Sequence, residues 1–145
     1  MELLSRYPDK TLLCMTVIMP GTIKRNTDSL TVAASAMKAL RELAPRVKIV
    51  QELDLETGYE AYALTDIDEL SAKEMACDIE ENTPLGRLFD IDIIDKQGVP
   101  ISRESIGRPP RRCIVCENEA RYCMRNHSHT QQEIQERIKQ LIATA

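Results

Sequence analysis

The sequence predicts an α+β fold in which an antiparallel sheet carries two helices on one face. Short apolar segments typical of strands alternate with longer segments that repeat apolar residues at helical spacing, in the order β-α-β-β-α-β. Turn-forming and helix-breaking residues stand where these segments meet, at Pro20, Gly21, Pro45, Gly58, Pro84 and Gly98. This order is typical of the ferredoxin-like split βαβ fold.

A polymerase-β-like nucleotidyltransferase fold is the alternative. That fold also places an Asp-x-Asp pair on a strand, and here Asp90 and Asp92 form such a pair. Its Gly-Ser turn normally lies well upstream of the pair, whereas Gly86 and Arg87 stand close to Asp90. The ferredoxin-like fold is therefore the favoured prediction.

The first half of the predicted core is a strand, a helix and a hairpin. Residues 11–19 are continuously apolar, which is typical of a central strand covered on both faces. A helix capped by Asp28 or Ser29 follows and runs to about residue 44, where Pro45 stops it. Residues 47–53 and 59–65 alternate and predict two strands of a hairpin.

The second half begins with a helix over residues 66–81, where Asp66 and Glu69 have capping-box spacing. Residues 88–94 then predict a strand, because β-branched and aromatic residues predominate. The turn at 95–98 leads into a short return strand at 99–102.

Two aspartates interrupt the strand at 88–94. Phe89, Ile91 and Ile93 point to one face, so Asp90 and Asp92 share the other. Their side chains stand about 6–7 Å apart along the strand, a separation that suits two carboxylates holding Mg²⁺. The alternative is a solvated face of an edge strand, where charged residues discourage aggregation.

Composition limits the possible functions. The 145 residues suit one domain, divided into an α+β core at 1–106 and a segment at 107–145 that packs on it. A net charge of −4 and a pI near 5.3 argue against a nucleic-acid surface. No apolar run is long enough for a membrane span. Five cysteines, an odd number, indicate a reducing compartment, so the sequence predicts a cytoplasmic protein.

Cysteine and histidine residues gather in the segment at 107–145. Cys113, Cys116 and Cys123, with a histidine within one or two turns, form a plausible tetrahedral ligand set for a structural Zn²⁺. A reduced helical knob without metal and a redox dithiol are the alternatives. Residues 130–142 predict a final helix with one apolar stripe.

Arginines crowd the same third of the chain. Arg is a bidentate partner of phosphate, and six of these residues lie between 103 and 125. The alternative is a set of ion pairs with the acidic helix at 66–81. If the arginines face Asp90 and Asp92, the combination is that of a phosphoryl or nucleotidyl transfer site. Lys24, in a loop after the first strand, could reach the same place.

Several segments, in this order, resemble the holo-citrate lyase synthases, or apo-citrate lyase phosphoribosyl-dephospho-CoA transferases. The resemblance covers nearly the whole chain, and two of its segments, 84–92 and 109–116, are highly specific in combination. The residues that carry it are Pro20-Gly-Thr-Ile-Lys24, Pro84-Leu-Gly-Arg-Leu-Phe-Asp-Ile-Asp92, Ile101-Ser-Arg103, Pro109-Pro-Arg-Arg-Cys-Ile-Val-Cys116, Cys123-Met-Arg125 and His129.

The resemblance implies a nucleotidyltransferase. Members of the family transfer 2′-(5″-triphosphoribosyl)-3′-dephospho-CoA to a serine of the citrate lyase acyl carrier protein and release pyrophosphate. The acceptor serine belongs to the partner, so this chain needs no nucleophile. On this hypothesis Asp90 and Asp92 are catalytic and hold Mg²⁺. The phosphates are bound by Lys24, Arg87, Arg108, Arg111 and Arg112.

The resemblance to this family also implies the fourth zinc ligand, and the sequence differs from the family pattern at its N-terminus. His129 aligns with the family pattern, whereas His127 is additional to it, so His129 is the expected ligand. Family members carry a further N-terminal segment with Arg and Gln positions, and this sequence begins almost at the first strand. We therefore expect no substrate contacts from such a segment here.

Two other functions are compatible with the residues. One is a non-catalytic zinc-knob module that binds an acyl carrier protein or another acidic partner, in which case the arginines matter for association and the aspartates do not. The other is a zinc-ribbon protein that binds nucleic acid, against which the negative net charge argues.

Overall fold

The computed structural model describes residues 6–19 and 24–145. Its sheet has four strands in the order β2-β3-β1-β4, and each neighbouring pair is antiparallel. The predicted turn at Pro20-Gly21 lies outside the described residues. The strands are β1 (Thr11–Val17), β2 (Val47–Leu55), β3 (Gly58–Thr65) and β4 (Phe89–Ile94). The prediction of a mixed fold with an antiparallel sheet is confirmed.

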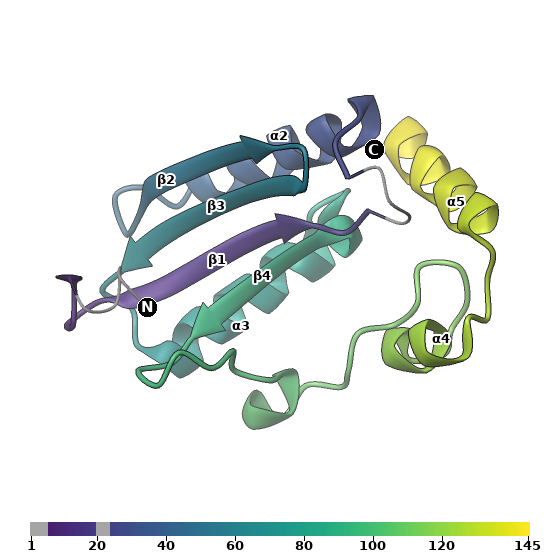
Figure 1. Ribbon diagram of the computed structural model, residues 1–145. Helices are drawn as coiled ribbons and strands as arrows, with labels where there is room; N and C mark the ends of the chain where they lie inside the picture. The colour runs from purple at the N-terminus through teal and green to yellow at the C-terminus, as the bar shows by residue number, and fades with distance from the viewer. Residues whose placement is uncertain (1–5, 20–23) are drawn as a thin grey trace.

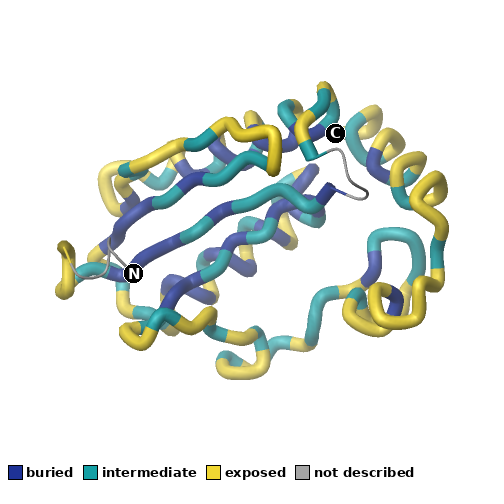
Figure 2. The backbone as a smooth tube through the Cα atoms, viewed as in Figure 1, coloured by how far each residue is buried: buried dark blue, intermediate teal, exposed yellow. Residues whose placement is uncertain are grey.

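Two helices cover one face of this sheet. Figure 1 shows α2 (Thr27–Arg41) and α3 (Glu69–Asn82) side by side behind the strands. The core forms between the two layers, because alternate strand residues such as Leu13 and Met15 point toward the helices. As the alternation predicts, Phe89, Ile91 and Ile93 are buried in this core. Figure 2 shows the buried backbone concentrated along β1, β3 and β4.

The helix starts differ from the predicted ones. Asn26, rather than Asp28 or Ser29, caps α2, because its side chain accepts a hydrogen bond from the Ser29 N–H at 2.8 Å. Asp68 caps α3 by accepting from the Ser71 N–H, while Asp66 instead pairs with Lys10. A tertiary ion pair therefore displaces the predicted capping box at Asp66.

The predicted return strand at 99–102 reduces to a single bridge between Ile94 and Pro100. Proline has no N–H to continue a ladder, and the short 3₁₀ helix η2 (Arg103–Ile106) begins directly after Ser102. The preceding turn forms as predicted, with the Asp95 side chain accepting from the Val99 N–H at 2.9 Å. One edge of β4 therefore faces the segment that follows it.

The rest of the chain passes β4 and returns to the core. It forms α4 (Ala120–Asn126) and α5 (Gln131–Thr144), which Figure 1 places on one side of the sheet. Ile138 of α5 is buried in the main core, and Lys139 pairs with Asp28 of α2. The final helix agrees closely with its predicted range, whereas α4 was not predicted as a helix. None of the helices within residues 6–19 and 24–145 is long and apolar enough to cross a membrane.

Gly86 is required where α3 passes the 3₁₀ helix η1 (Gly86–Leu88). A Cβ atom at this position would lie 2.3 Å from the Glu80 carbonyl oxygen and 2.6 Å from that of Ile79. We expect Gly86→Ala to lower the free energy of unfolding by about 3 kcal/mol, because backbone must move to admit the methyl group. Urea denaturation measures the loss.

Gly107→Ala is the matched control for this substitution. Gly107 has a φ of +74°, and a Cβ atom there would have no neighbouring atom within 4 Å, so only backbone strain opposes alanine. We expect a loss of about 1 kcal/mol. Equal stability of Gly86→Ala and the wild type would contradict the close approach of η1 to α3.

Candidate functional site

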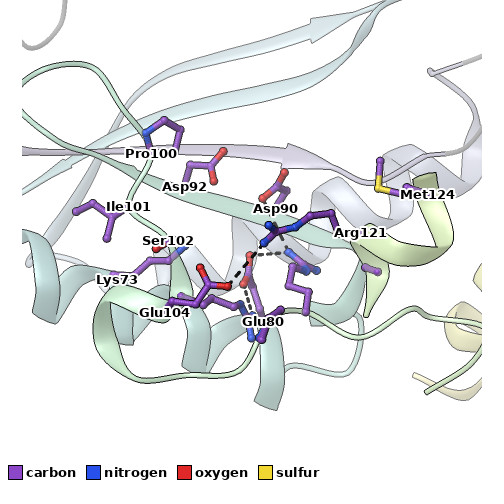
Figure 3. Close-up of a pocket in the computed structure, with 14 residues that line it drawn as sticks. Lys73, Glu80, Asp90, Asp92, Pro100, Ile101, Ser102, Glu104, Arg121 and Met124 are labelled. Atoms are coloured by element: carbon purple, nitrogen blue, oxygen red, sulfur yellow. Dashed lines mark hydrogen bonds and ion pairs between the residues drawn. The ribbon is translucent and has the colours of Figure 1, made fainter. Parts of the chain in front are cut away.

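A cavity of about 410 Å³ lies along the outer edge of β4. Four parts of the chain line it, namely α3, β4, the segment from Pro100 to Arg111, and α4 (Figure 3). Both predicted catalytic aspartates are in its wall. The cavity is thus where the sequence-predicted carboxylates meet residues from distant parts of the chain.

Asp90 and Asp92 project from the sheet face opposite to the helices. Asp90 lies across from Thr16 of β1, and Asp92 lies across from Cys14. Burial raises the pKa of Asp92, and the negative charge of Asp90 raises it further. Two carboxylates whose charges oppose each other in this way form a favourable site for a divalent cation, which would balance both.

The nearest thiol is not a nucleophile. Burial, followed by the charge of Asp92, raises the pKa of Cys14 to about 11. Cys14 therefore remains protonated at neutral pH, and its thiolate is not available for covalent catalysis. This agrees with a reaction in which the nucleophile comes from the substrate.

A buried glutamate that the sequence did not reveal organises the cavity wall. The Glu80 side chain is only 3% exposed and accepts three hydrogen bonds. Its Oε1 accepts from Arg103 at 2.7 Å, and its Oε2 accepts from Arg111 at 3.0 Å and from the Ile91 N–H at 2.9 Å. One carboxylate thus fixes two arginines to α3 and to the strand that carries the aspartates.

Arg111 is the predicted phosphate-binding residue that lies nearest to the aspartates. Besides Glu80, its guanidinium donates to the carbonyl oxygens of Phe89 at 2.7 Å and Arg87 at 2.8 Å. Its Nη1 lies 3.9 Å from Asp90 Oδ1. Arg111 therefore places a fixed positive charge beside the carboxylate pair.

The other predicted phosphate-binding residues lie away from the aspartates. Arg87 and Arg112 line a neighbouring cavity that shares Arg111 with the first. Arg87 donates to the Cys113 carbonyl oxygen at 2.7 Å, and Arg112 reaches the Glu117 carbonyl oxygen at 3.4 Å. These two side chains face the Cys/His segment at least as much as the aspartates.

Arg108 and Lys24 have partners within the protein. Arg108 bonds to Asp78 at 2.7 Å and to Glu81 at 2.5 Å, both on α3. These are ion pairs of the kind that the sequence left open as an alternative to phosphate binding. The Lys24 ammonium donates to the Met19 carbonyl oxygen at 2.6 Å.

The three cysteines and His129 converge. One ligand atom from each of Cys113, Cys116, Cys123 and His129 lies within 4.8 Å of all the others. The Sγ atoms of Cys116 and Cys123 are 3.4 Å apart, and all of these cysteines are free. His129 Nε2 is buried without a hydrogen-bond partner among the described residues. An orphaned imidazole nitrogen beside three thiols fits a metal ion, and His127 is exposed and outside the cluster.

Sequence reasoning missed Lys73 and Glu80 as cavity residues, whereas Arg103 and Arg121 belong to the arginine cluster that it considered but were given no individual role. The apolar stripe of the helix at 66–81 does not include Lys73 or Glu80, and charged residues in a helix usually face solvent. Lys73 lies four residues before Cys77, and Glu80 lies three residues after it, so the three side chains share one stripe of the helix. All three are buried. This shared stripe was the available signal.

Comparisons with known proteins place the chain in one family. The model of the family described as apo-citrate lyase phosphoribosyl-dephospho-CoA transferase matches residues 1–145. A probable apo-citrate lyase phosphoribosyl-dephospho-CoA transferase of Streptococcus pyogenes serotype M18 is 35% identical, over 98% of this chain and 77% of the relative. One of the same description from Vibrio cholerae serotype O1 is 36% identical, over 90% and 76%. Protein CitXG of Haemophilus influenzae is 36% identical, over 97% of this chain and 31% of that longer relative.

Replacing the central glutamate should destabilise the protein. Glu80→Gln removes the charge that pairs with Arg103 and Arg111 while conserving the side-chain shape. We expect the free energy of unfolding to fall by about 2–3 kcal/mol, because two partly buried guanidinium groups lose their anion. Glu81→Gln is the matched control, since Glu81 also pairs with Arg103 but its side chain is 50% exposed. Its expected loss is under about 1 kcal/mol, and equal losses in the two variants would contradict the central role of Glu80.

Proposed function

Because the chain belongs to the apo-citrate lyase phosphoribosyl-dephospho-CoA transferase family, we propose that it attaches the phosphoribosyl-dephospho-CoA prosthetic group to apo-citrate lyase. The donor in this proposal is 2′-(5″-triphosphoribosyl)-3′-dephospho-CoA, and the acceptor is a serine of the acyl carrier protein. The observation that carries the proposal is the Asp90–Asp92 pair in a cavity with Arg111, in a chain matched by the family along its whole length.

The reaction is a displacement at phosphorus. The serine oxygen forms a bond to the α-phosphorus, and the bond from that phosphorus to the bridging oxygen breaks. Pyrophosphate leaves with the electron pair, and the serine proton passes to water. The chain must therefore hold a polyanionic donor, exclude competing water and balance negative charge near the α-phosphorus.

Asp90 and Asp92 would hold Mg²⁺ in this site. When bound, the ion supplies charge neutralisation at the triphosphate. Arg111, fixed by Glu80 and two carbonyl groups, adds a positive charge that needs no reorganisation. Arg87 and Arg112 bind phosphates from the neighbouring cavity in this proposal. Lys24 and Arg108 keep the predicted role, which requires Arg108 to leave its ion pairs.

The Cys/His cluster holds a structural zinc ion in this proposal. Three thiolates and one imidazole are the ligands that a closed Zn²⁺ site prefers. The segment from Cys113 to His129 has few buried apolar residues, so metal ligation would contribute much of its folding energy. The segment also forms part of the cavity wall through α4, and the zinc would thereby stabilise the site without taking part in the reaction.

The fold is ferredoxin-like in this proposal. The strand order, with β1 and β3 central and two helices on one face, supports it. The core at 1–106 and the segment at 107–145 form a single domain, which the burial of Ile138 in the main core supports.

A binding module without chemistry is the second candidate. One observation favours it: Arg103 and Arg108 are engaged by acidic residues of α3 and offer a triphosphate fewer free cations, whereas the Arg121 side chain on α4 is 68% exposed to an acidic partner. In that case the aspartates would be dispensable. Binding of an acyl carrier protein would weaken as the salt concentration rises, and no reaction would follow when Mg²⁺ is present.

The rate of pyrophosphate release separates these functions. Asp90→Asn and Asp92→Asn should each lower the rate at least about 100-fold while the protein stays folded, because the Mg²⁺ ligands are lost. Asp95→Asn is the matched control, since Asp95 accepts only turn hydrogen bonds that asparagine can also accept. Near-wild-type release by either Asn variant at 90 or 92 would contradict the role of that residue.

Zinc content tests the Cys/His cluster. The purified protein should contain about one zinc ion per chain by elemental analysis. His129→Ala should lose most of it and unfold at lower temperature, whereas His127→Ala should retain it. Equal zinc in the two histidine variants would show that His129 is not a ligand.

A further inference from the structure

A buried lysine lies in the wall of the candidate site. Lys73 is only 6% exposed, although lysine is seldom buried unless its charge is paired. In the part of the chain that the structure describes, no carboxylate lies within ion-pair distance of its ammonium group. The ammonium itself is not among the buried polar atoms that lack a partner, so the buried stem presents the charge to the cavity, where an anionic ligand can meet it.

Lys73 has a defined position relative to the aspartates. It lies seven residues before Glu80 on α3, and Figure 3 shows both side chains among those that line the cavity together with Asp90 and Asp92 of β4. The positive charge of Lys73 lowers the pKa of Asp92, against the effects of burial and Asp90. The Lys73 charge is therefore close enough to interact with a ligand bound beside Asp90 and Asp92.

The neighbouring charges leave Lys73 available. Glu80, the nearest buried carboxylate along α3, already accepts from Arg103, Arg111 and the Ile91 N–H. Asp90 and Asp92 would be balanced by a divalent cation. Glu104, the remaining carboxylate of the wall, lies 3.8 Å from Arg121. Once that cation is bound, each carboxylate of the wall has a positive partner other than Lys73, so the cavity becomes receptive to a further anion.

We propose that the Lys73 ammonium binds a phosphate oxygen of the pyrophosphate group that leaves, which makes Lys73 a substrate-binding residue. This inference rests on the proposed function. As the bond from the α-phosphorus to the bridging oxygen breaks, the departing pyrophosphate gains negative charge, and Lys73 balances it. A lysine suits this task because its ammonium is a compact charge with three donors, mounted here on a rigid helix.

Binding of inorganic pyrophosphate tests the inference without the transfer reaction. Titration calorimetry on the full chain, with Mg²⁺ present, compares the wild type with Lys73→Met, which conserves the length of the side chain and removes its charge. We expect the dissociation constant for pyrophosphate to rise at least 10-fold. Lys38→Met, at an exposed position on α2, should bind as the wild type does. Lys73→Gln serves the same purpose if methionine prevents folding.

Two results would overturn the inference. One is unchanged pyrophosphate affinity in Lys73→Met and Lys73→Gln. The other is an absence of Mg²⁺-dependent pyrophosphate binding by the wild type. A lysine that served only as a counter-ion of Asp92 would change Mg²⁺ affinity or stability while pyrophosphate affinity stayed constant, which is the first of these results.

The transfer assay separates this failure from failure of the proposed function. If the wild type transfers the prosthetic group and Lys73→Met does so at an unchanged rate with unchanged pyrophosphate affinity, the function stands and the inference fails. If the wild type transfers nothing but Lys73→Met still loses pyrophosphate binding, the function fails and the anion site at Lys73 stands.

Discussion

The buried carboxylate of Glu80 is the interaction on which the candidate site depends. It joins α3 to the backbone of β4 through the Ile91 N–H, and it holds two arginines that belong to the segment after the sheet. Between Ser102 and α5 the chain buries little apolar surface with which to dock. A desolvated carboxylate that accepts from three donors fixes the position of this segment, which hydrophobic packing alone would not do. Charge-assisted hydrogen bonds are strong and geometrically specific.

This arrangement divides the positive charges into two groups. Arg103, Arg108 and Arg111 pair with acidic residues of α3, and only Arg111 among them also approaches Asp90. Lys73, which is buried in the same wall, keeps its charge unpaired within the described residues. The site therefore contains structural cations and a ligand-binding cation. Removal of a structural arginine should lower the stability of the protein, whereas removal of the Lys73 charge should lower the affinity for the ligand.

Local patterns in the sequence explain what could be predicted. Period-two alternation places Phe89, Ile91 and Ile93 in the core and Asp90 and Asp92 on the opposite face, as the structure has them. The spacing of Cys113 and Cys116 predicted a ligand cluster, although the choice of His129 as its fourth member came from the family resemblance. These features depend on neighbours a few residues apart, so the sequence contains them directly.

Partners that are distant in the sequence explain what could not. Arg108 meets Asp78 and Glu81 across some thirty residues, and only the folded chain decides between that pairing and phosphate binding. Lys73 and Glu80 were not predicted to be buried, because charged residues in a helix usually face solvent. The burial of Glu80 depends on the arrival of Arg103 and Arg111, which no helical periodicity encodes.

The mass of the acceptor protein tests the central claim most directly. Apo-citrate lyase acyl carrier protein would be incubated with this chain, Mg²⁺ and 2′-(5″-triphosphoribosyl)-3′-dephospho-CoA, and its intact mass then measured. We expect a gain equal to the mass of the donor minus pyrophosphate, abolished by EDTA and restored by added Mg²⁺ alone. An unchanged acceptor mass with folded, zinc-loaded protein would contradict the account of this cavity as a prosthetic-group transferase site.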